Sequence, residues 1–302
     1  MIAIKWLSSN SFAMRPHRLV PFLCLAVAAC VRPATPPALG PLPFATDTAR
    51  VERVTEGVWY RYLYAPSGPW AIHVLDVDLS RCNRLVAVKG SKSAAGRTKT
   101  TQLLARLARE TIDGRVVAGV NADFFSLANG TPVGLLVVDG RKLTDPGGES
   151  AFGVDSSGHA WVAAGGEALA RGPRYAVGGR PLLIRDSVIT SDVETNGDAG
   201  FRGRNPRTAV GVARAGRRVV FVVIDGRQKP YSDGTSLRET ASILLALGAR
   251  DALNLDGGGS STIALSTSPE PPSFLRIANR PSDAVGERPV GDAIAVIHTC
   301  AS

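Results

Sequence analysis

Six consecutive apolar residues at 219–224 (Val-Val-Phe-Val-Val-Ile) constrain the fold more than any other feature of the sequence. A strand that is apolar at every position is buried on both faces, so it belongs in the centre of a sheet. Residues 236–247 follow with leucine and isoleucine at helical spacing, Gly248 ends that helix, and residues 252–256 form another strand. This order predicts a β–α–β unit at 219–256, whose two strands are parallel and joined by a right-handed crossover.

Shorter segments with strand and helix patterns precede this unit. Residues 51–64 and 71–88 contain alternating apolar and polar positions, which are typical of strands with one solvated face. A helix at 100–110 leads into an apolar strand at 116–120, and short hairpins are predicted in the middle of the chain. We therefore expect one α+β (mixed α/β) domain over residues 51–302, with a mixed β-sheet core and flanking helices.

The N-terminus has the composition of an export signal. Basic residues at 15–18 precede an apolar run at 19–29, which is shorter than the roughly 18–20 residues that a membrane span needs. Residues 1–29 are therefore predicted to be a signal peptide of the lipoprotein type, removed from the mature protein. Met14 would begin a more typical signal than Met1, so either residue can be the true start.

Residues 27–30, Val-Ala-Ala-Cys, are similar to the lipobox of bacterial lipoproteins. In such proteins the cysteine, here Cys30, is lipidated and holds the protein on a membrane surface. Cleavage without a lipid is the alternative. Residues 30–50 contain five prolines and predict an extended tether. We expect a protein of the bacterial cell envelope, either periplasmic or an outer-membrane lipoprotein, or else a secreted protein.

Cysteine content and charge agree with export. Cys24 and Cys30 lie in or next to the signal, which leaves Cys82 and Cys300 near the two ends of the folded region. They can form a disulfide in an oxidising compartment, and two unrelated buried thiols are the alternative. The net charge falls from +9 to +6 without residues 1–29, and this excess suits an anionic ligand. Nucleic acid is disfavoured as a partner by the export signal.

Apolar strands end in acidic residues at several places. Asn121 and Asp123 follow the strand at 116–120, Asp225 follows the central strand, and Asp256 follows the last strand. The strand period of two also places Asn254 and Asp256 on one face. If these strands are neighbours, their polar ends meet at one edge of a sheet, where ligands gather. The alternative is that each aspartate only begins a turn.

A glycine-rich segment follows Asp256 directly. Gly257, Gly258 and Gly259 let backbone amides approach a ligand closely and can form an anion-binding nest, and Ser260 adds a hydroxyl donor. The segment lacks the Walker-A lysine and the dinucleotide-binding spacing, so a nucleotide site is disfavoured. No histidine belongs to a motif, and the shortage of histidine and cysteine disfavours zinc.

Two arginines and an aromatic residue complete the set of candidate ligands. Arg207 and Arg227 carry guanidinium groups that match phosphate oxygens, although surface arginines are common in a basic protein. Phe124 can stack on a sugar face or belong to the core. Glu239 is a candidate carboxylate, but Ser236 and Glu239 also have the spacing of a capping box, which accounts for the glutamate locally.

The chain resembles the phosphodiester glycosidase family over about residues 70–298. The resemblance is carried by GVNADFF (119–125), NPRTAVGV (205–212), VVFVVIDGR (219–227), YSDGTSLRETASILLALGA (231–249), NLDGGGSSTIAL (254–265) and RPVGDAIAV (288–296). A glycine pair in the first block of many members is replaced here by Ala122-Asp123. The family includes many bacterial envelope proteins that are linked to exopolysaccharide.

The resemblance implies hydrolysis of glycosyl-1-phosphodiesters, of the N-acetylglucosamine-1-phosphodiester kind, at the sugar side of the phosphate. The implied catalytic carboxylates are Asp123, Glu239 and Asp256. The implied substrate-binding residues are Asn121, Phe124, Arg207, Asp225, Arg227, Asn254, Gly257, Gly258, Gly259 and Ser260. No cofactor is required, although the carboxylates can hold a calcium or magnesium ion. A glycosidase for glycans without phosphate and a non-catalytic glycan-binding protein of the envelope are the alternatives.

Overall fold

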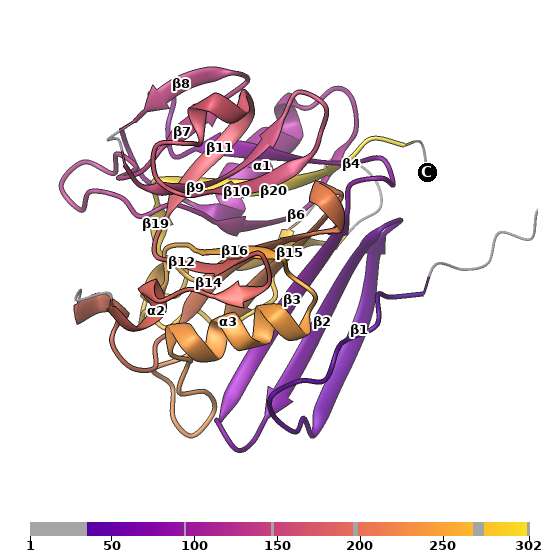
Figure 1. Ribbon diagram of the computed structural model, residues 1–302. Coiled ribbons are helices and arrows are strands. Elements are labelled where there is room, and N and C mark those ends of the chain that lie inside the picture. The colour runs from indigo at the N-terminus through magenta and orange to yellow at the C-terminus, as the bar shows by residue number, and fades with distance from the viewer. Residues whose placement is uncertain (1–34, 94, 146–147, 196–198, 268–274, 301–302) are drawn as a thin grey trace, which may run out of the picture. The chain divides into compact units, whose positions relative to one another are not determined.

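The computed structural model describes residues 35–93, 95–145, 148–195, 199–267 and 275–300 (Figure 1). The expected signal peptide and the Cys30 lipidation site lie outside the described residues. Among the residues that are described, none of the helices combines the length and the apolar composition needed to cross a bilayer.

Antiparallel sheets make up most of the fold. The largest sheet contains, in spatial order, β1 (Thr48–Thr55), β2 (Val58–Ala65), β3 (Trp70–Asp78), β15 (Arg218–Ile224), β14 (Arg207–Ala213), β16 (Asp251–Asn254), β12 (Leu182–Arg185) and β13 (Val188–Ile189). A second sheet contains β18 (Leu275–Ile277), β17 (Ile263–Ser266), β6 (Arg115–Asn121), β20 (Asp292–His298) and β4 (Asn83–Lys89).

A third sheet contains β10 (Ala160–Ala163), β9 (Ser150–Asp155), β11 (Pro173–Gly179), β7 (Leu136–Val138) and β8 (Arg141–Thr144), and β19 (Pro289–Val290) pairs with β5 (Thr98–Lys99). The α-helices of the described residues are α1 (Thr100–Glu110), α2 (Asp192–Thr195) and α3 (Leu237–Ala246). Short 3₁₀ turns occupy Leu169–Arg171, Ala199–Phe201, Arg214–Gly216 and Gly258–Ser260.

The expectation of a mixed α/β (α+β) fold is wrong, because strands dominate the structure and every strand pairing among the described residues is antiparallel. Strands β15 and β16 do run in the same direction, as the β–α–β prediction at 219–256 required. They are not neighbours, because β14 lies between them and pairs antiparallel with both. The sequence pattern identified β15 and the helix but did not identify β14 as the strand that separates the two parallel strands.

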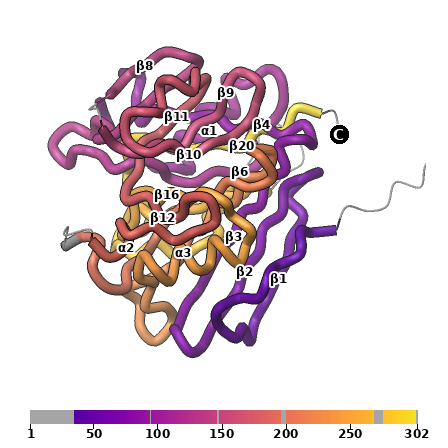
Figure 2. The backbone as a smooth tube through the Cα atoms, in the orientation of Figure 1, coloured from indigo at the N-terminus to yellow at the C-terminus, as the bar shows by residue number. Residues whose placement is uncertain are grey.

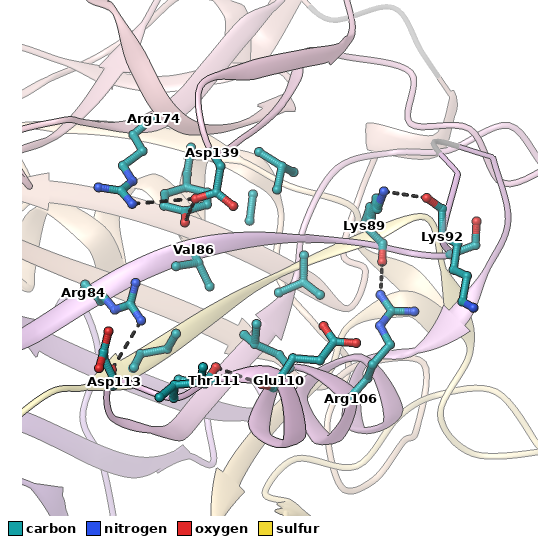
Figure 3. Close-up of a pocket in the computed structure, with 18 residues that line it drawn as sticks. Arg84, Val86, Lys89, Lys92, Arg106, Glu110, Thr111, Asp113, Asp139 and Arg174 are labelled. Carbon is teal, nitrogen blue, oxygen red and sulfur yellow. Dashed lines mark hydrogen bonds and ion pairs between the residues drawn. The ribbon is translucent and has the colours of Figure 1, made fainter.

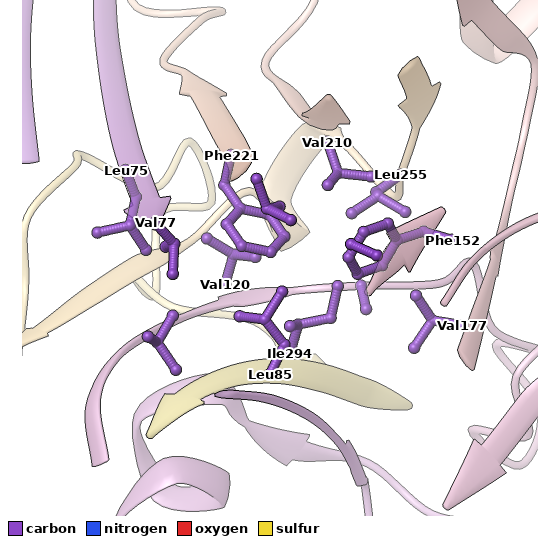
Figure 4. Packing of buried hydrophobic residues seen from close by; sticks show 14 of the residues in the cluster. Leu75, Val77, Leu85, Val120, Phe152, Val177, Val210, Phe221, Leu255 and Ile294 are labelled. Atoms are coloured by element: carbon purple, nitrogen blue, oxygen red, sulfur yellow. The ribbon is translucent and has the colours of Figure 1, made fainter. Parts of the chain in front are cut away.

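Strand β15 is buried on both faces, which confirms the prediction from its sequence. Val219, Phe221 and Val223 face the core between the sheets, where Phe221 meets Phe152 of β9 at 6.0 Å between ring centroids (Figure 4). The intervening residues of β15 face the other side of the sheet, toward α3. Because successive side chains of a strand point to opposite faces of the sheet, β15 contributes to two separate hydrophobic cores.

Helices cover the outer faces of two sheets. The buried residues of α3, including Leu237 and Leu244, pack against the outer face of the eight-stranded sheet. Leu103 and Leu104 of α1 pack against β6 and β20 in the second sheet. The expected helix at 100–110 and the strand after it are therefore both confirmed.

The described part of the proline-rich segment packs against the domain. Gly40 N donates a hydrogen bond of 2.9 Å to Ala246 O at the end of α3, so the two chain segments lie side by side (Figure 2). Leu39, Leu42 and Phe44 contact the core on the α3 side of the sheet. Residues 35–47 therefore contribute apolar contacts to the domain.

Cys82 and Cys300 form a disulfide, with their Cα atoms 5.5 Å apart. This distance lies in the ordinary range for a disulfide. Of the two alternatives that the sequence left open, the structure has the bridge. It closes a loop of 218 residues, and so restricts the unfolded chain.

Candidate active site

A cavity of about 260 Å³ opens beside the start of β14 and the end of β16. Four arginines line it, Arg180, Arg207, Arg227 and Arg288, together with one carboxylate, Asp256. Because β14 and β16 are antiparallel neighbours, the first residues of one strand lie next to the last residues of the other. The sheet therefore brings the cation Arg207 and the acid Asp256 to one edge.

Arg207 is a buried cation without an acidic partner among the described residues. Only 2% of its surface is exposed, and its guanidinium donates to the carbonyl oxygens of Thr235 (3.0 Å), Phe201 (2.9 Å) and Gly203 (3.0 Å). Burial lowers the pKa of Arg207 to about 10, and the charge of Arg227 adds to this effect. A buried charge that lacks a counter-ion is costly, so an anion in the cavity would stabilise it.

Arg227 supplies a second cation that no described carboxylate neutralises. Its Nε and Nη2 atoms donate to Asn205 Oδ1 at 3.2 Å and 2.8 Å, which fixes the guanidinium plane without cancelling its charge. Gly258, with a φ of +62°, lies so close that an added Cβ would come 3.3 Å from Arg227 Nη1. The glycine therefore permits the close approach of the loop to this arginine.

The glycine segment docks on the chain that leads into β14. Gly258 N donates to Pro206 O at 2.9 Å, and a Cβ on Gly257 would meet the same carbonyl oxygen at 2.6 Å. The amide of Gly258 is thus engaged with the main chain. The glycines bring the chain close to Arg227, and the guanidinium groups provide the charge for an anion.

Asp256 is held from both sides of its backbone. Its N atom donates to Ala122 O at 2.8 Å, and its O atom accepts from Asn121 Nδ2 at 2.6 Å. Burial raises the pKa of Asp256 to about 6, against the opposing effects of the Ser260 hydroxyl, the Arg288 charge and the Gly257 amide. A carboxyl with this pKa is ionised at neutral pH and still accepts a proton readily, as a general base must.

An aromatic wall closes another side of the cavity. Phe124 and Phe201 meet edge to face, with ring centroids 5.5 Å apart. The guanidinium of Arg180 lies 5.5 Å from the Phe124 ring and forms a 3.1 Å ion pair with Glu149. Aromatic faces beside polar groups suit the apolar face of a sugar ring.

Seven of the thirteen residues that the sequence nominated line the cavity, namely Phe124, Arg207, Arg227, Asn254, Asp256, Gly257 and Gly258. The other six, Asn121, Asp123, Asp225, Glu239, Gly259 and Ser260, do not line it. The nominated set therefore divides into groups that face the cavity and groups that build the structure around it.

Asn121 supports the site from beneath. Besides holding the backbone of Asp256, it accepts at Oδ1 from Thr208 Oγ1 (2.8 Å) and from Thr262 N (3.0 Å). One buried amide thus ties β6 to β14 and to the strand after the glycine segment. Asp123 is also buried, and its Oδ2 atom accepts from Gly134 N at 2.6 Å.

Asp225 is saturated by protein donors. Its carboxylate accepts from His73 Nε2 (3.1 Å), Tyr231 Oη (2.9 Å), Asn279 Nδ2 (3.0 Å) and Arg280 N (3.0 Å). It therefore ties the end of β15 to the segment at 279–280.

Glu239 forms the capping box of α3 with Ser236 and an ion pair of 2.8 Å with Arg204. Burial raises the pKa of Glu239, but the Arg204 contact and the Ser236 amide outweigh it, so the pKa is lowered. Gly259 lets the ion pair of Asp283 and Arg288 pack against the backbone, because a Cβ at this position would lie 2.0 Å from Asp283 Oδ1. Ser260 is fully buried.

Several cavity residues had no distinct signal in the sequence. Arg288 begins the RPVGDAIAV block, in which nothing marks it as a ligand, and it pairs with Asp283 through contacts of 2.7 Å and 2.9 Å. Arg180 is a single arginine at the bend after β11, and Asn205, the first residue of the NPRTAVGV block, forms an isolated β-bridge with Thr235. Asp292 does not line the cavity. It is the first residue of β20, accepts from Asp123 N at 2.7 Å and precedes the apolar residues 293–297, and that position could have nominated it.

A larger groove of about 540 Å³ lies elsewhere, between β4 and α1 on one side and the turn after β7 on the other (Figure 3). Its arginines form one exposed ion pair and hydrogen bonds to main-chain oxygens. Arg174 lies 3.8 Å from Asp139, Arg84 donates to Asp113 O, and Arg106 donates to Lys89 O. The groove is therefore larger but lacks a buried cation opposite an acid.

Among the described residues, no three His, Cys, Asp or Glu side chains gather as a metal site would require. Binding of calcium or magnesium stays a prediction, and no role is assigned to a metal below.

The described domain is thus an antiparallel β protein with a cationic pocket that holds one reactive carboxylate. A sequence profile of the phosphodiester glycosidase family matches residues 114–297, and the chain belongs to this family. Human N-acetylglucosamine-1-phosphodiester alpha-N-acetylglucosaminidase is 31% identical over 189 residues, which cover 57% of this chain and 35% of the relative. The bovine protein of the same name is 29% identical over 162 residues, 48% of this chain and 30% of the relative.

Solved structures share the fold. The zebrafish N-acetylglucosamine-1-phosphodiester alpha-N-acetylglucosaminidase catalytic domain, auto-inhibited by its pro-peptide, superposes with a TM-score of 0.62 and 19% identity, covering 84% of this chain and 88% of that one. A putative exported protein from Burkholderia pseudomallei superposes with a TM-score of 0.57 and 22% sequence identity, covering 76% of this chain and 74% of that one. The present chain spans about a third of the curated mammalian relatives it matches.

Proposed function

We propose that this protein hydrolyses glycosyl-1-phosphodiesters between the sugar and the phosphate, and that its substrates are anionic glycans of the cell envelope or its surroundings. One observation carries the proposal. Arg207 and Arg227 are two neighbouring cations without described acidic partners, and they share a cavity with Asp256. Family membership supports the same chemistry, since the curated relatives are named for a phosphodiester-cleaving activity on a sugar.

The residues divide into two roles. Arg207 and Arg227 bind the phosphate oxygens and stabilise the charge that this group gains when it leaves. Asp256 takes a proton from water as the water oxygen bonds to C1 of the sugar. The bond between C1 and the phosphate oxygen breaks, its electron pair stays on that oxygen, and the products are a free sugar and a phosphomonoester. Phe124 packs against the sugar ring.

The direct test uses the purified full chain and a nucleoside-diphosphate sugar or a chromogenic sugar-1-phosphodiester. We expect release of free sugar, and a loss of at least about 100-fold in kcat/KM for both Asp256→Asn and Arg207→Ala. Arg53→Ala, an exposed residue on β1, serves as the matched control and should retain wild-type activity.

Two results would contradict the proposal. The wild type could hydrolyse a phosphate-free aryl glycoside as fast as the phosphodiester, with no change in this rate in Arg207→Ala. That result would favour an ordinary glycosidase. Tight binding of the sugar phosphodiester without any turnover would favour a glycan-binding protein.

We also propose that the protein is exported and held on a membrane surface through lipid on Cys30. The Cys82–Cys300 disulfide supports the export, because such bonds persist in oxidising compartments. Cys30→Ser should move the protein from the membrane fraction to the soluble fraction of disrupted cells. An unchanged distribution would refute the lipid anchor without affecting the proposed reaction.

A further inference from the structure

Asp292 is a completely buried acid that the proposed reaction does not use. It is the first residue of β20, and the rest of this strand is also buried. Burying a carboxyl group costs free energy unless the group is hydrogen-bonded or paired. Its contacts show that it acts on the residues that support Asp256.

A short chain of contacts joins Asp292 to Asp256. Asp292 Oδ1 accepts from Asp123 N at 2.7 Å, and Asp292 O accepts from Ala122 N at 3.4 Å. Ala122 O in turn accepts from Asp256 N, and Asn121 Nδ2 donates to Asp256 O. Residues 121–123 are thus held by Asp292 on one side and hold Asp256 on the other.

The charges around Asp292 are mostly negative. Burial raises the pKa of Asp292 to about 7 against the opposing hydrogen bond from the Asp123 amide, and the charge of Asp256 raises it further. Burial and the charge of Asp292 also raise the pKa of Asp123, to which Glu149 adds. Lys89 is the register partner of Asp292 on β4, but its ammonium donates to Lys92 O.

Two carboxylate oxygens in this cluster are buried without a partner among the described residues. They are Asp123 Oδ1 and Asp292 Oδ2. Ionising both carboxyls would place two unpaired charges in a region of low dielectric, which is strongly unfavourable. The pair therefore keeps at least one proton at neutral pH.

We propose that Asp292 is a positioning residue of the active site: its carboxyl oxygen holds residues 121–123 in the arrangement that supports Asp256, and its neutral form is the active one. Its ionisation adds a buried negative charge near Asp256 and beside an anionic substrate. The enzyme therefore carries a built-in alkaline limit that arises outside the cavity. This inference rests on the proposed function for its kinetic test, but not for its stability test.

The kinetic test compares Asp292→Asn with Asp292→Ala. We expect kcat/KM of the wild type to fall by at least about threefold between pH 7 and 8.5, and this fall to be absent in Asp292→Asn, which cannot ionise. Asp292→Ala loses the acceptor for the Asp123 amide, so at pH 6 its kcat should be about tenfold lower with KM nearly unchanged. Asp292→Asn keeps an oxygen there and should retain most of kcat.

Two kinetic results would overturn the proposal. One is an alkaline fall in Asp292→Asn that equals that of the wild type. The other is an Asp292→Ala enzyme with wild-type kcat. Asp186→Asn, an exposed aspartate paired with Arg250, is the matched control and should leave the profile unchanged.

A second measurement needs no substrate. Because the pKa of Asp292 is raised by folding, its contribution to stability is fully present below pH 4 and is lost as pH rises through about 7. The Tm of the wild type should therefore decline from pH 5 to pH 8 more than that of Asp292→Asn. Equal declines would refute the raised pKa of Asp292 even if the protein cleaved no phosphodiester, and a failed activity assay would leave this result valid.

Discussion

Two hollows of the described domain differ in how their cations are buried and compensated. The groove beside α1 has about twice the volume of the cavity at β14 and β16, and it also contains several cations (Figure 3). In the groove, Arg174 faces Asp139 and Arg106 donates to a main-chain carbonyl near the surface. In the cavity, Arg207 is buried and has no described acidic partner.

This difference teaches that charge compensation identifies a site better than size. A solvent-exposed ion pair gains little, and its charges are already neutralised for any ligand. A buried cation without a counter-ion gains much when an anion arrives. The three predictions below test this contrast between the cavity and the groove.

The largest expected effect is on the pH dependence of activity. Since the pKa of Asp256 is about 6, kcat/KM should fall about tenfold per pH unit below that value.

Folding raises this pKa, so the contribution of Asp256 to stability is present at low pH and lost as pH rises through about 6. Acid should therefore stop activity without unfolding the site, which circular dichroism at each pH would check. Glu110→Gln in the groove should leave the fall of kcat/KM below about pH 6 unchanged. A shift of this fall in the variant would show that the groove also affects the reaction.

Removing one cation from each hollow should give the next largest effect. Arg227→Ala should lower kcat/KM about 10- to 100-fold, mainly through KM, because a charged hydrogen bond to phosphate is lost. Arg106→Ala in the groove should change kcat/KM by less than about twofold, since this arginine does not line the cavity and donates to the main-chain oxygen of Lys89. Steady-state kinetics on the same sugar phosphodiester would measure both. Similar losses in the two variants would show that the groove also binds the substrate.

The smallest effect should come from adding a methyl group beside Arg227. Gly258→Ala and Gly140→Ala both place alanine at a positive φ, +62° and +74°, and each should lose about 1 kcal/mol of stability. Only Gly258 has Arg227 nearby, whereas Gly140 has open space around its Cβ position. Thermal unfolding should therefore show similar losses, while KM rises only in Gly258→Ala. An unchanged KM would show that the loop does not fix this arginine.

Local patterns predicted the elements of the fold well. The continuous apolar run at 219–224 is buried on both faces, and Ser236 begins α3 with the expected capping box. Such patterns depend on burial and on contacts between residues close in sequence, so the chain itself encodes them. The family resemblance likewise depended on short blocks that the sequence displays directly.

The pairing of strands could not be predicted from the same patterns. A strand, a helix and a second strand indicate a parallel pair, but β14 lies between β15 and β16 and pairs antiparallel with each of them. Strand β14 is buried along its whole length, and its small residues include Gly211, where a Cβ would lie 2.7 Å from Ala249 Cβ. Which strand fits such a place depends on packing across the sheet.

By itself, the sequence determined which residues could do chemistry, where strands and helices form, and to which family the chain is related. Only the tertiary structure decided which of those residues act together. It turned Asp225 toward protein donors and Glu239 toward a helix cap, brought Arg180 and Arg288 to the cavity, and placed Asp292 beneath Asp256. The physical reason is that periodicity records burial along the chain, whereas charge neutralisation depends on neighbours that are distant in sequence.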